Sequence, residues 1–249
     1  MRISTLAAVI LILPVLLFPG QSRAEQHVTI AIDIGHSVES KGALSSRNRP
    51  EYVFNRRMAA VVLRELKKDA RLRPFIINPD GSDISLQERA GIVNAAKSDI
   101  LISIHHDSVQ QEFLSDWIYR GVPARFCDAY RGYSLFISEK NGRPEASRRL
   151  AIVAGRELKK AGFLPSAHHA ALLKGEGKQP VDSATGVYRY DGLVVLKEAK
   201  CPAVLLECGI IRNRSEETLL RSRAYQARMA RAIRQALVDF LKDRKHAPR

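Results

Sequence analysis

Cysteine is scarce in this chain, and the scarcity argues against a metal site built from cysteines. Three cysteines among 249 residues cannot all pair within one chain, and no two of them have the close spacing of a structural zinc site. Cys201 and Cys208 flank an apolar run that, as a strand, would hold them roughly 23 Å apart, beyond disulfide reach. Cys127 could bond either one, so its pairing stays open.

Long apolar runs are also lacking, except at the N-terminus. Leu6 to Phe18 is apolar but contains Pro14, and its 13 residues fall short of the about 20 that a transmembrane helix needs. Small residues follow it and end at Ala24, as in a cleavable signal peptide. We therefore predict a signal peptide over residues 1–24 and export to the periplasm or medium. The remaining residues, 25–249, fit one domain without a transmembrane anchor.

Acidic residues are the minority among the charges, with 26 against 40 basic ones and a net charge of +14. Removal of Arg2 and Arg23 with the signal peptide leaves a net charge of +12. This excess predicts an anionic partner. Export and the scatter of the basic residues argue against nucleic acid. An anionic envelope polymer or a membrane surface fits better.

Predicted strands and helices alternate along the chain, and nothing in it is repeated or of low complexity. This alternation predicts a single α/β domain with a mostly parallel or mixed twisted sheet and helices on both faces. Residues 109–132 have no clear period and are expected to be irregular, and residues 166–185 are expected to form a loop. Residues 187–190 and 193–196 are expected to form two short strands, or one strand followed by a turn. Ser215 is expected to cap a helix. The expected strands are residues 28–36, 73–78, 99–107, 133–138 and 202–207, and the expected long helices begin at Pro50, at Ser85, at Glu145 and at Tyr225.

Three of these strands end in residues that suit catalysis. His36, His105 and Glu207 stand where open α/β sheets bind ligands, and Glu51 begins a helix beside them. Two histidines and one carboxylate match a hydrolytic zinc site, while a second carboxylate that does not bind the metal can carry a proton. His36-Ser-Val-Glu39 also has the spacing of zinc carboxypeptidases, so spacing alone leaves Glu39 and Glu51 as competing third ligands.

Several segments together resemble the zinc-dependent N-acetylmuramoyl-L-alanine amidases of the type 3 class. The resemblance spans almost the whole chain after residue 24, in the right order. The segments are Ala31-Ile-Asp33-Ile-Gly35-His36, Glu51-Tyr-Val-Phe-Asn55, Ser85-Leu-Gln-Glu-Arg89, Ser103-Ile-His105 and Pro202-Ala-Val-Leu-Leu-Glu207-Cys-Gly209.

The resemblance implies one zinc ion per chain, bound by His36, Glu51 and His105, with Glu207 as the catalytic acid/base. The implied reaction is hydrolysis of the amide between N-acetylmuramic acid and L-alanine in peptidoglycan. An activator protein would be a further possible partner, and the substrate-binding residues are not identified. A carboxypeptidase-like zinc peptidase and a catalytically silent wall-binding module are the alternatives.

The chain departs from the family pattern around the proposed ligands. Ile34 and Ser37 replace the usual Pro and Gly, and His106-Asp107 stands where the family has Ala-Asn. Strand alternation turns His106 to the other face of the sheet and returns Asp107 to the side of His105. We expect His106 to have no role. The sequence leaves the roles of Asp107, His168 and His169 open: Asp107 could alter substrate contacts or the charge of the site, and the two histidines could belong to a functional loop or form a solvated pair. No helix that could plug the site is evident within residues 109–132.

The charge excess gives a test with purified peptidoglycan sacculi. We expect the protein to bind sacculi less tightly as salt rises from about 0.1 M to about 1 M, because the Debye length falls from roughly 10 Å to 3 Å. Co-sedimentation measured across this range checks the expectation. Binding that does not change with salt would contradict it.

Overall fold

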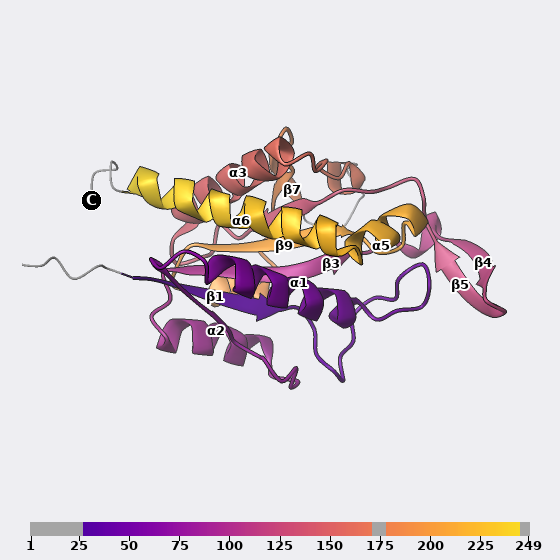
Figure 1. Ribbon diagram of the computed structural model, residues 1–249, viewed down its shortest axis with the longest axis horizontal. Coiled ribbons are helices and arrows are strands. Elements are labelled where there is room, and N and C mark those ends of the chain that lie inside the picture. Colours follow the sequence, from indigo (N-terminus) through magenta and orange to yellow (C-terminus); the bar gives the residue numbers. More distant parts are fainter. Residues whose placement is uncertain (1–26, 171–177, 245–249) are drawn as a thin grey trace, which may run out of the picture.

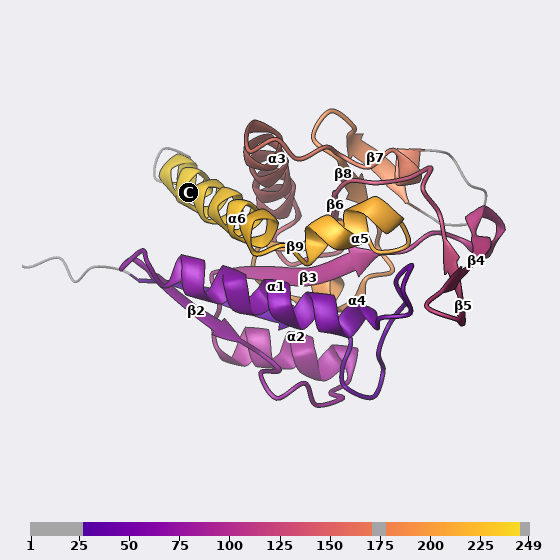
Figure 2. The same cartoon turned by 45° about the vertical axis from the view of Figure 1, so that its right-hand side comes forward.

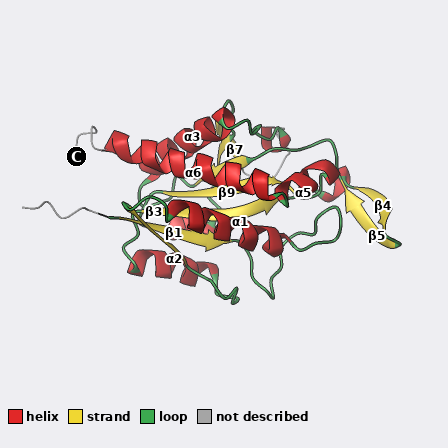
Figure 3. Cartoon of the chain, viewed as in Figure 1, coloured by secondary structure: helices red, strands yellow, loops and turns green. Residues whose placement is uncertain are grey.

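A seven-stranded sheet lies between two layers of helices (Figures 1 and 3). The computed structural model describes residues 27–170 and 178–244. Its strands are β1 Val28–Ile34, β2 Leu72–Ile76, β3 Ile100–Asp107, β4 Ser115–Tyr119, β5 Val122–Phe126, β6 Ser134–Ile137, β7 Gln179–Asp182, β8 Val187–Arg189 and β9 Ala203–Ile210. Its helices are α1 Glu51–Leu66, α2 Leu86–Ala95, α3 Pro144–Lys160, α4 Val194–Glu198, α5 Arg214–Leu220 and α6 Arg223–Arg244, with short 3-10 helices η1 Gln111–Phe113 and η2 His168–Ala170.

The sheet is mixed and has the strand order β2-β1-β3-β9-β6-β8-β7. Strands β2, β1, β3 and β9 run parallel, whereas β6 runs antiparallel to β9 and β7 runs antiparallel to β8. Helices α1, α3 and α6 cover one face, and α2 and α4 cover the other (Figure 2). The predicted fold class, a single α/β domain with helices on both faces, is confirmed.

The two faces of the central strands carry different residues because side chains alternate along a strand. On β1, Ile30 and Ile32 are fully buried in the core under α1, and Ala31 packs in the core under α2 and α4. Both faces of the strand are therefore apolar, as expected for a parallel strand covered by helices on both sides. Most of the polar side chains of these strands, among them His105, His106 and Asp107 on β3, lie near their carboxyl ends.

Local signals placed the main helices correctly. Ser85 and Glu88 form a reciprocal capping box at the start of α2. Pro50 precedes α1, and Gly162 follows α3 with φ of +82°, a conformation that costs a glycine little. These boundaries agree with the sequence predictions to within a residue or two.

Four local predictions are wrong. The loop expected over residues 166–185 contains η2 and the strand β7 in its described part. Residues 109–132 contain η1 and the β4–β5 hairpin, whose two-residue turn places Arg120 and Gly121 at φ of +54° and +78°, the geometry that a tight hairpin favours. Residues 193–196 start the helix α4, not a strand. Asn213, not Ser215, caps α5 by accepting bonds from two backbone N–H groups.

The remaining predictions concern the signal peptide, membrane-spanning helices and the pairing of the cysteines. The proposed signal peptide, residues 1–24, and the last five residues lie outside the described part of the chain. Within the described part, no helix is both long and apolar enough to cross a membrane. Cys127, Cys201 and Cys208 are all free and buried, so neither of the pairings open to Cys127 is formed.

A buried ion pair joins β1 to α2 under the end of the sheet. The Arg89 guanidinium donates to Asp33 Oδ1 over 2.7 Å, and the two side chains are only 4% and 2% exposed. Ser103 Oγ donates to the other carboxylate oxygen of Asp33 over 2.6 Å. The pair is therefore fully hydrogen-bonded, which a buried charge requires.

Breaking this pair from one side should destabilise the fold. Arg89→Met leaves the Asp33 carboxylate buried without its cation, and we expect a loss of about 3–5 kcal/mol in the free energy of unfolding. Urea denaturation measures it. Arg148→Met is the matched control, because Arg148 pairs with Glu139 at the surface and should cost no more than about 1 kcal/mol. Equal effects of the two substitutions would refute the argument.

Candidate metal centre

The candidate site lies at the carboxyl edge of three adjacent parallel strands. His36 follows β1, His105 lies near the end of β3, and Glu207 pairs in register with His105 on β9. Glu51 is the first residue of α1, whose N-terminus meets the same edge. The fold thus brings together all four residues that the sequence singled out.

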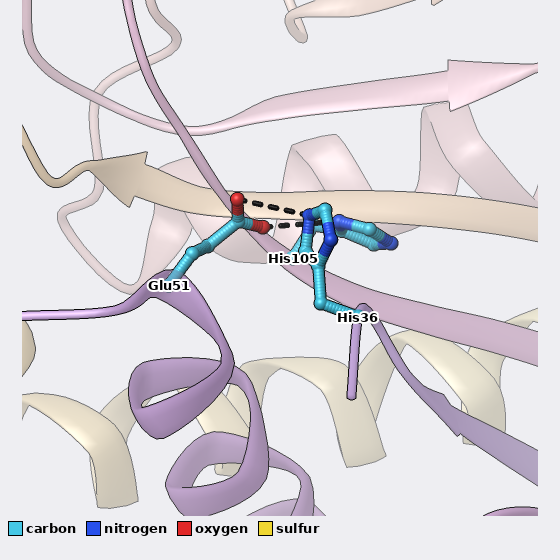
Figure 4. Close-up of side chains that lie close together, drawn as sticks. All are labelled: His36, Glu51 and His105. Carbon is cyan, nitrogen blue, oxygen red and sulfur yellow. Dashed lines mark hydrogen bonds and ion pairs between the residues drawn. The ribbon is translucent and has the colours of Figure 1, made fainter. Parts of the chain in front are cut away.

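Two imidazole rings face one carboxylate at this edge (Figure 4). His36 Nε2 lies 3.0 Å from Glu51 Oε2, and His105 Nδ1 lies 3.1 Å from Glu51 Oε1. One potential ligand atom from each residue lies within 4.8 Å of the others. Two histidines and a carboxylate at this separation are the ligand set of a catalytic zinc site that keeps a position open.

His36 occupies a backbone conformation that needs support. Its φ of +66° lies in the left-handed region, which is unfavourable for residues other than glycine. Arg89 supplies part of that support, since its guanidinium donates to the carbonyl oxygens of Ile34 over 2.5 Å and His36 over 2.7 Å. The Arg89 side chain therefore links the buried Asp33 carboxylate directly to the backbone of a candidate ligand.

Two glycines leave the space that the imidazole rings occupy. A Cβ atom at Gly35 would lie 2.3 Å from His105 Nε2. A Cβ at Gly42, where φ is +74°, would lie 2.6 Å from His36 Cδ2 and 2.7 Å from Glu51 Oε2. Backbone without side chains thus forms a cradle around the three candidate ligands.

Asn55 and His106 hold the Glu51 carboxylate from behind. Asn55 Nδ2 donates to Glu51 Oε1 over 3.1 Å and to the Gly35 carbonyl over 3.0 Å. His106 Nδ1 lies 2.7 Å from Asn55 Oδ1. The His106 ring lies on the α1 side, as its alternation predicted, but the expectation that it has no role misses this contact with Asn55.

Electrostatics favour an ionised Glu51. Burial alone would raise the pKa of its carboxyl, but the hydrogen bonds and charges of His105 and His36 outweigh burial and hold that pKa well below its ordinary value. Burial lowers the pKa of His106 to about 3, so this ring is neutral. An anionic carboxylate beside two rings suits a divalent cation, and these residues therefore fit a metal ion.

Glu207 has the opposite electrostatic setting. Burial, followed by the negative charges of Asp107 and Glu51, raises the pKa of its carboxyl well above the ordinary value, against a smaller lowering by Lys178. Its Oε2 atom is buried and accepts no hydrogen bond from any residue in 27–170 or 178–244. A buried carboxyl with a raised pKa and an unused oxygen suits proton transfer.

The competing acid from the sequence lies elsewhere. Glu39 is exposed on the loop after β1, and it does not belong to the metal-competent group of His36, Glu51 and His105. A cavity of about 640 Å³ opens beside His36 and His105 on the α2 and α4 side of the sheet. This cavity gives a substrate room next to the candidate metal position.

The sequence missed a second group of polar side chains near the site. Asp107 Oδ2 lies 2.6 Å from His169 Nε2, across 62 residues of sequence. His168 lies close enough that these three residues form another group with metal-competent spacing. Single-sequence patterns gave no signal for this contact, because it joins a strand end to a distant loop.

The chain is similar to known amidases over most of its length. Residues 30–239 match the family model described as N-acetylmuramoyl-L-alanine amidase. The curated protein named probable N-acetylmuramoyl-L-alanine amidase AmiB of Haemophilus influenzae is 27% identical over 234 residues, which cover 86% of this chain and 52% of that protein. This chain therefore spans about half the length of that relative.

Solved structures share the fold. The N-acetylmuramoyl-L-alanine amidase from Clostridium difficile 630 superposes with a TM-score of 0.68 at 23% identity, over 87% of this chain and 98% of that one. The CwlD amidase from Clostridioides difficile, solved in complex with the GerS lipoprotein, has a TM-score of 0.66 at 20% identity and covers 87% and 99% of the two chains.

The glycine cradle gives a test that leaves every candidate ligand in place. Gly35→Ala pushes a methyl group into the His105 ring, and we expect affinity for Zn²⁺ to fall by about tenfold or more, within the range seen when the surroundings of metal ligands are changed. Competition with a chromophoric chelator measures the affinity. Gly91→Ala is the control, since its Cβ meets no atom within 4 Å on α2. Equal zinc affinity of the two variants would contradict the cradle.

Proposed function

Because the chain belongs to the N-acetylmuramoyl-L-alanine amidase family, we propose that it hydrolyses the amide bond between N-acetylmuramic acid and L-alanine in peptidoglycan. The observation that carries the proposal is the meeting of His36, Glu51 and His105 at one sheet edge, with Glu207 paired in register beside them. That edge combines a metal-competent group with a buried proton carrier. Together a metal and a proton carrier can activate water and move its proton during hydrolysis of an amide.

In this proposal one zinc ion is held by His36, Glu51 and His105. When bound, zinc supplies a Lewis acid for the amide carbonyl and lowers the pKa of water. Asn55 keeps the Glu51 carboxylate oriented toward the two rings, and Arg89 keeps the His36 backbone in its left-handed conformation. These buried hydrogen bonds thus fix the geometry of the metal ligands before the substrate binds.

Glu207 moves the proton in the proposed reaction. Its carboxylate accepts a proton from the attacking water as the carbon–oxygen bond forms. It then returns that proton to the amide nitrogen as the carbon–nitrogen bond breaks, which releases the peptide with a free amino group and leaves a carboxylate on the lactyl group. Burial and the neighbouring acids, which raise the pKa of Glu207, make its carboxyl able to hold the proton between the two steps.

The proposal extends to location and partners. Residues 1–24 act as the signal peptide, residues 25–249 form the catalytic domain, and the enzyme works outside the cytoplasm on peptidoglycan. The net charge of +12 that remains after removal of residues 1–24 supports contact with an anionic envelope polymer. The complex of CwlD with the GerS lipoprotein supports a test for a protein activator of this chain as well.

The two alternative functions have less support. A carboxypeptidase-like site would use Glu39, but that side chain is exposed and apart from the two histidines. A silent wall-binding module would have no use for a buried Glu207 whose Oε2 accepts no hydrogen bond from the described part of the chain.

Digestion of purified sacculi tests the proposed function. We expect the zinc-loaded protein to release intact stem peptides with a free L-alanine amino group, identified by mass spectrometry. Glu207→Gln should lower the rate by at least about a hundredfold while zinc stays bound, whereas Glu51→Gln should lose zinc.

Glu39→Gln is the matched control and should behave like the wild type. Loss of zinc in Glu39→Gln together with normal binding in Glu51→Gln would overturn the ligand assignment. Cleavage within the peptide would favour the peptidase, and no release of peptide would favour the silent module.

A further inference from the structure

Asp107 and His169 join β3 to the segment that begins with η2. Asp107 Oδ2 lies 2.6 Å from His169 Nε2, and Asp107 Oδ1 accepts a hydrogen bond from the Ser108 backbone over 2.8 Å. Both side chains are well shielded, with the His169 side chain 1% and the Asp107 side chain 13% exposed. A contact this short between shielded groups fixes the position of the His169 ring.

Lys178 determines which nitrogen of His169 carries the proton. Lys178 Nζ lies 3.1 Å from His169 Nδ1, and an ammonium group can only donate. His169 Nδ1 is therefore the acceptor, and the ring proton sits on Nε2, from which it is donated to Asp107. The three residues form a chain of hydrogen bonds in which Lys178 donates to His169 and His169 donates to Asp107.

These hydrogen bonds argue against a metal ion at the same place, although the spacing of Asp107, His168 and His169 would allow one. A metal on His169 Nε2 would replace the proton that is donated to Asp107. His169 Nδ1 would then have to carry the proton and point it at the Lys178 ammonium, which is itself a donor, whereas ligating histidines donate from their second nitrogen to an acceptor.

The His169 ring lies across the strand that carries Glu207. In the sheet, β9 lies between β3 and β6. His169 contacts Asp107 on β3, and its ring centroid lies 5.1 Å from that of Phe136 on β6. Phe136 pairs with Leu205 and Ser134 pairs with Glu207, so these residues and Glu207 share one face of the sheet. The ring therefore spans β9 on the face to which Glu207 points.

The charged groups at the two ends of this hydrogen-bond chain also act on the Glu207 carboxyl. Asp107 raises and Lys178 lowers the pKa of Glu207, so the charges of both groups act on its carboxyl. His169 is a polar side chain that bridges β3 and β6, the strands on either side of β9. We therefore attribute the burial of Glu207 Oε2 to the His169 ring above it.

We propose that His169, held between Lys178 and Asp107, is a positioning residue of the amidase site that forms the wall against which the Glu207 carboxyl is oriented and kept from water. This inference rests on the proposed function. It assigns a role in the proton-transfer step and none in holding zinc, so its loss should change kcat and not the metal content.

Paired histidine substitutions test the inference. His169→Phe keeps an aromatic ring against Phe136 but removes both hydrogen bonds, and we expect kcat on a soluble N-acetylmuramoyl-peptide to fall by about 10–100-fold with KM changed less than about threefold. His169→Gln keeps a donor for Asp107 and should recover part of the loss. His168→Phe is the matched control, because the His168 ring packs against Tyr130 and Phe113, and its kcat should stay within about threefold of the wild type.

Two further measurements separate the possible failures. Long-range proton–nitrogen NMR of the zinc-loaded wild type should show His169 as the neutral Nε2–H form, assigned by the signal missing in His169→Phe. Zinc per chain, by plasma mass spectrometry, should be one in all variants. Two zinc ions in the wild type and one in both His168→Phe and His169→Phe would replace the inference with a second metal site.

The remaining outcomes separate failure of the positioning role from failure of the proposed function. A kcat for His169→Phe equal to that of an active wild type, or loss of zinc from His169→Phe, would overturn the positioning role alone. A folded, zinc-loaded wild type that releases no stem peptide would instead overturn the proposed function.

Discussion

Because β1, β3 and β9 run parallel and in register, the segments that follow them leave the sheet at one edge. Ile34 pairs with Ile104, and His105 pairs with Glu207, so His36 and the other two side chains come from neighbouring positions. The N-terminus of α1 reaches the same edge and adds Glu51. A shift of one residue in any of these strands would turn a functional side chain to the opposite face.

Buried polar side chains secure that edge from both faces of the sheet. On the α2 side, Arg89 bridges Asp33 and the His36 carbonyl. On the α1 side, His106 contacts Asn55, which in turn holds the Glu51 carboxylate. Such groups are expensive to bury unless they are hydrogen-bonded. The hydrogen bonds offset that cost and hold the candidate ligands in place.

The site also separates its carboxylates by environment. Glu51 lies between two imidazole rings that keep it ionised, whereas burial and neighbouring acids raise the pKa of Glu207. Two glutamates on one sheet edge thus have opposite tendencies, one suited to binding a cation and the other to holding a proton. Asp107 contributes to this difference, and its own partner His169 comes from a loop far along the chain.

The sequence alone determined the α/β class, the main strands, the helix starts and the family. Apolar runs, the capping box at Ser85 and the strand-end histidines are local patterns. Such patterns can be recognised from neighbouring residues alone, without knowledge of the fold. The sequence also named the four residues at the sheet edge, but its spacing left Glu39 and Glu51 as rivals. The β4–β5 hairpin and α4 escaped it because short elements carry weak periodicity.

Only the tertiary structure decided which distant groups meet. It brought Glu51 to the two histidines and left Glu39 exposed, and it gave His106 a partner in Asn55. It also joined Asp107 to His169 across 62 residues. The physical reason is that a hydrogen bond between remote segments depends on strand order and register, which no window of neighbouring residues contains.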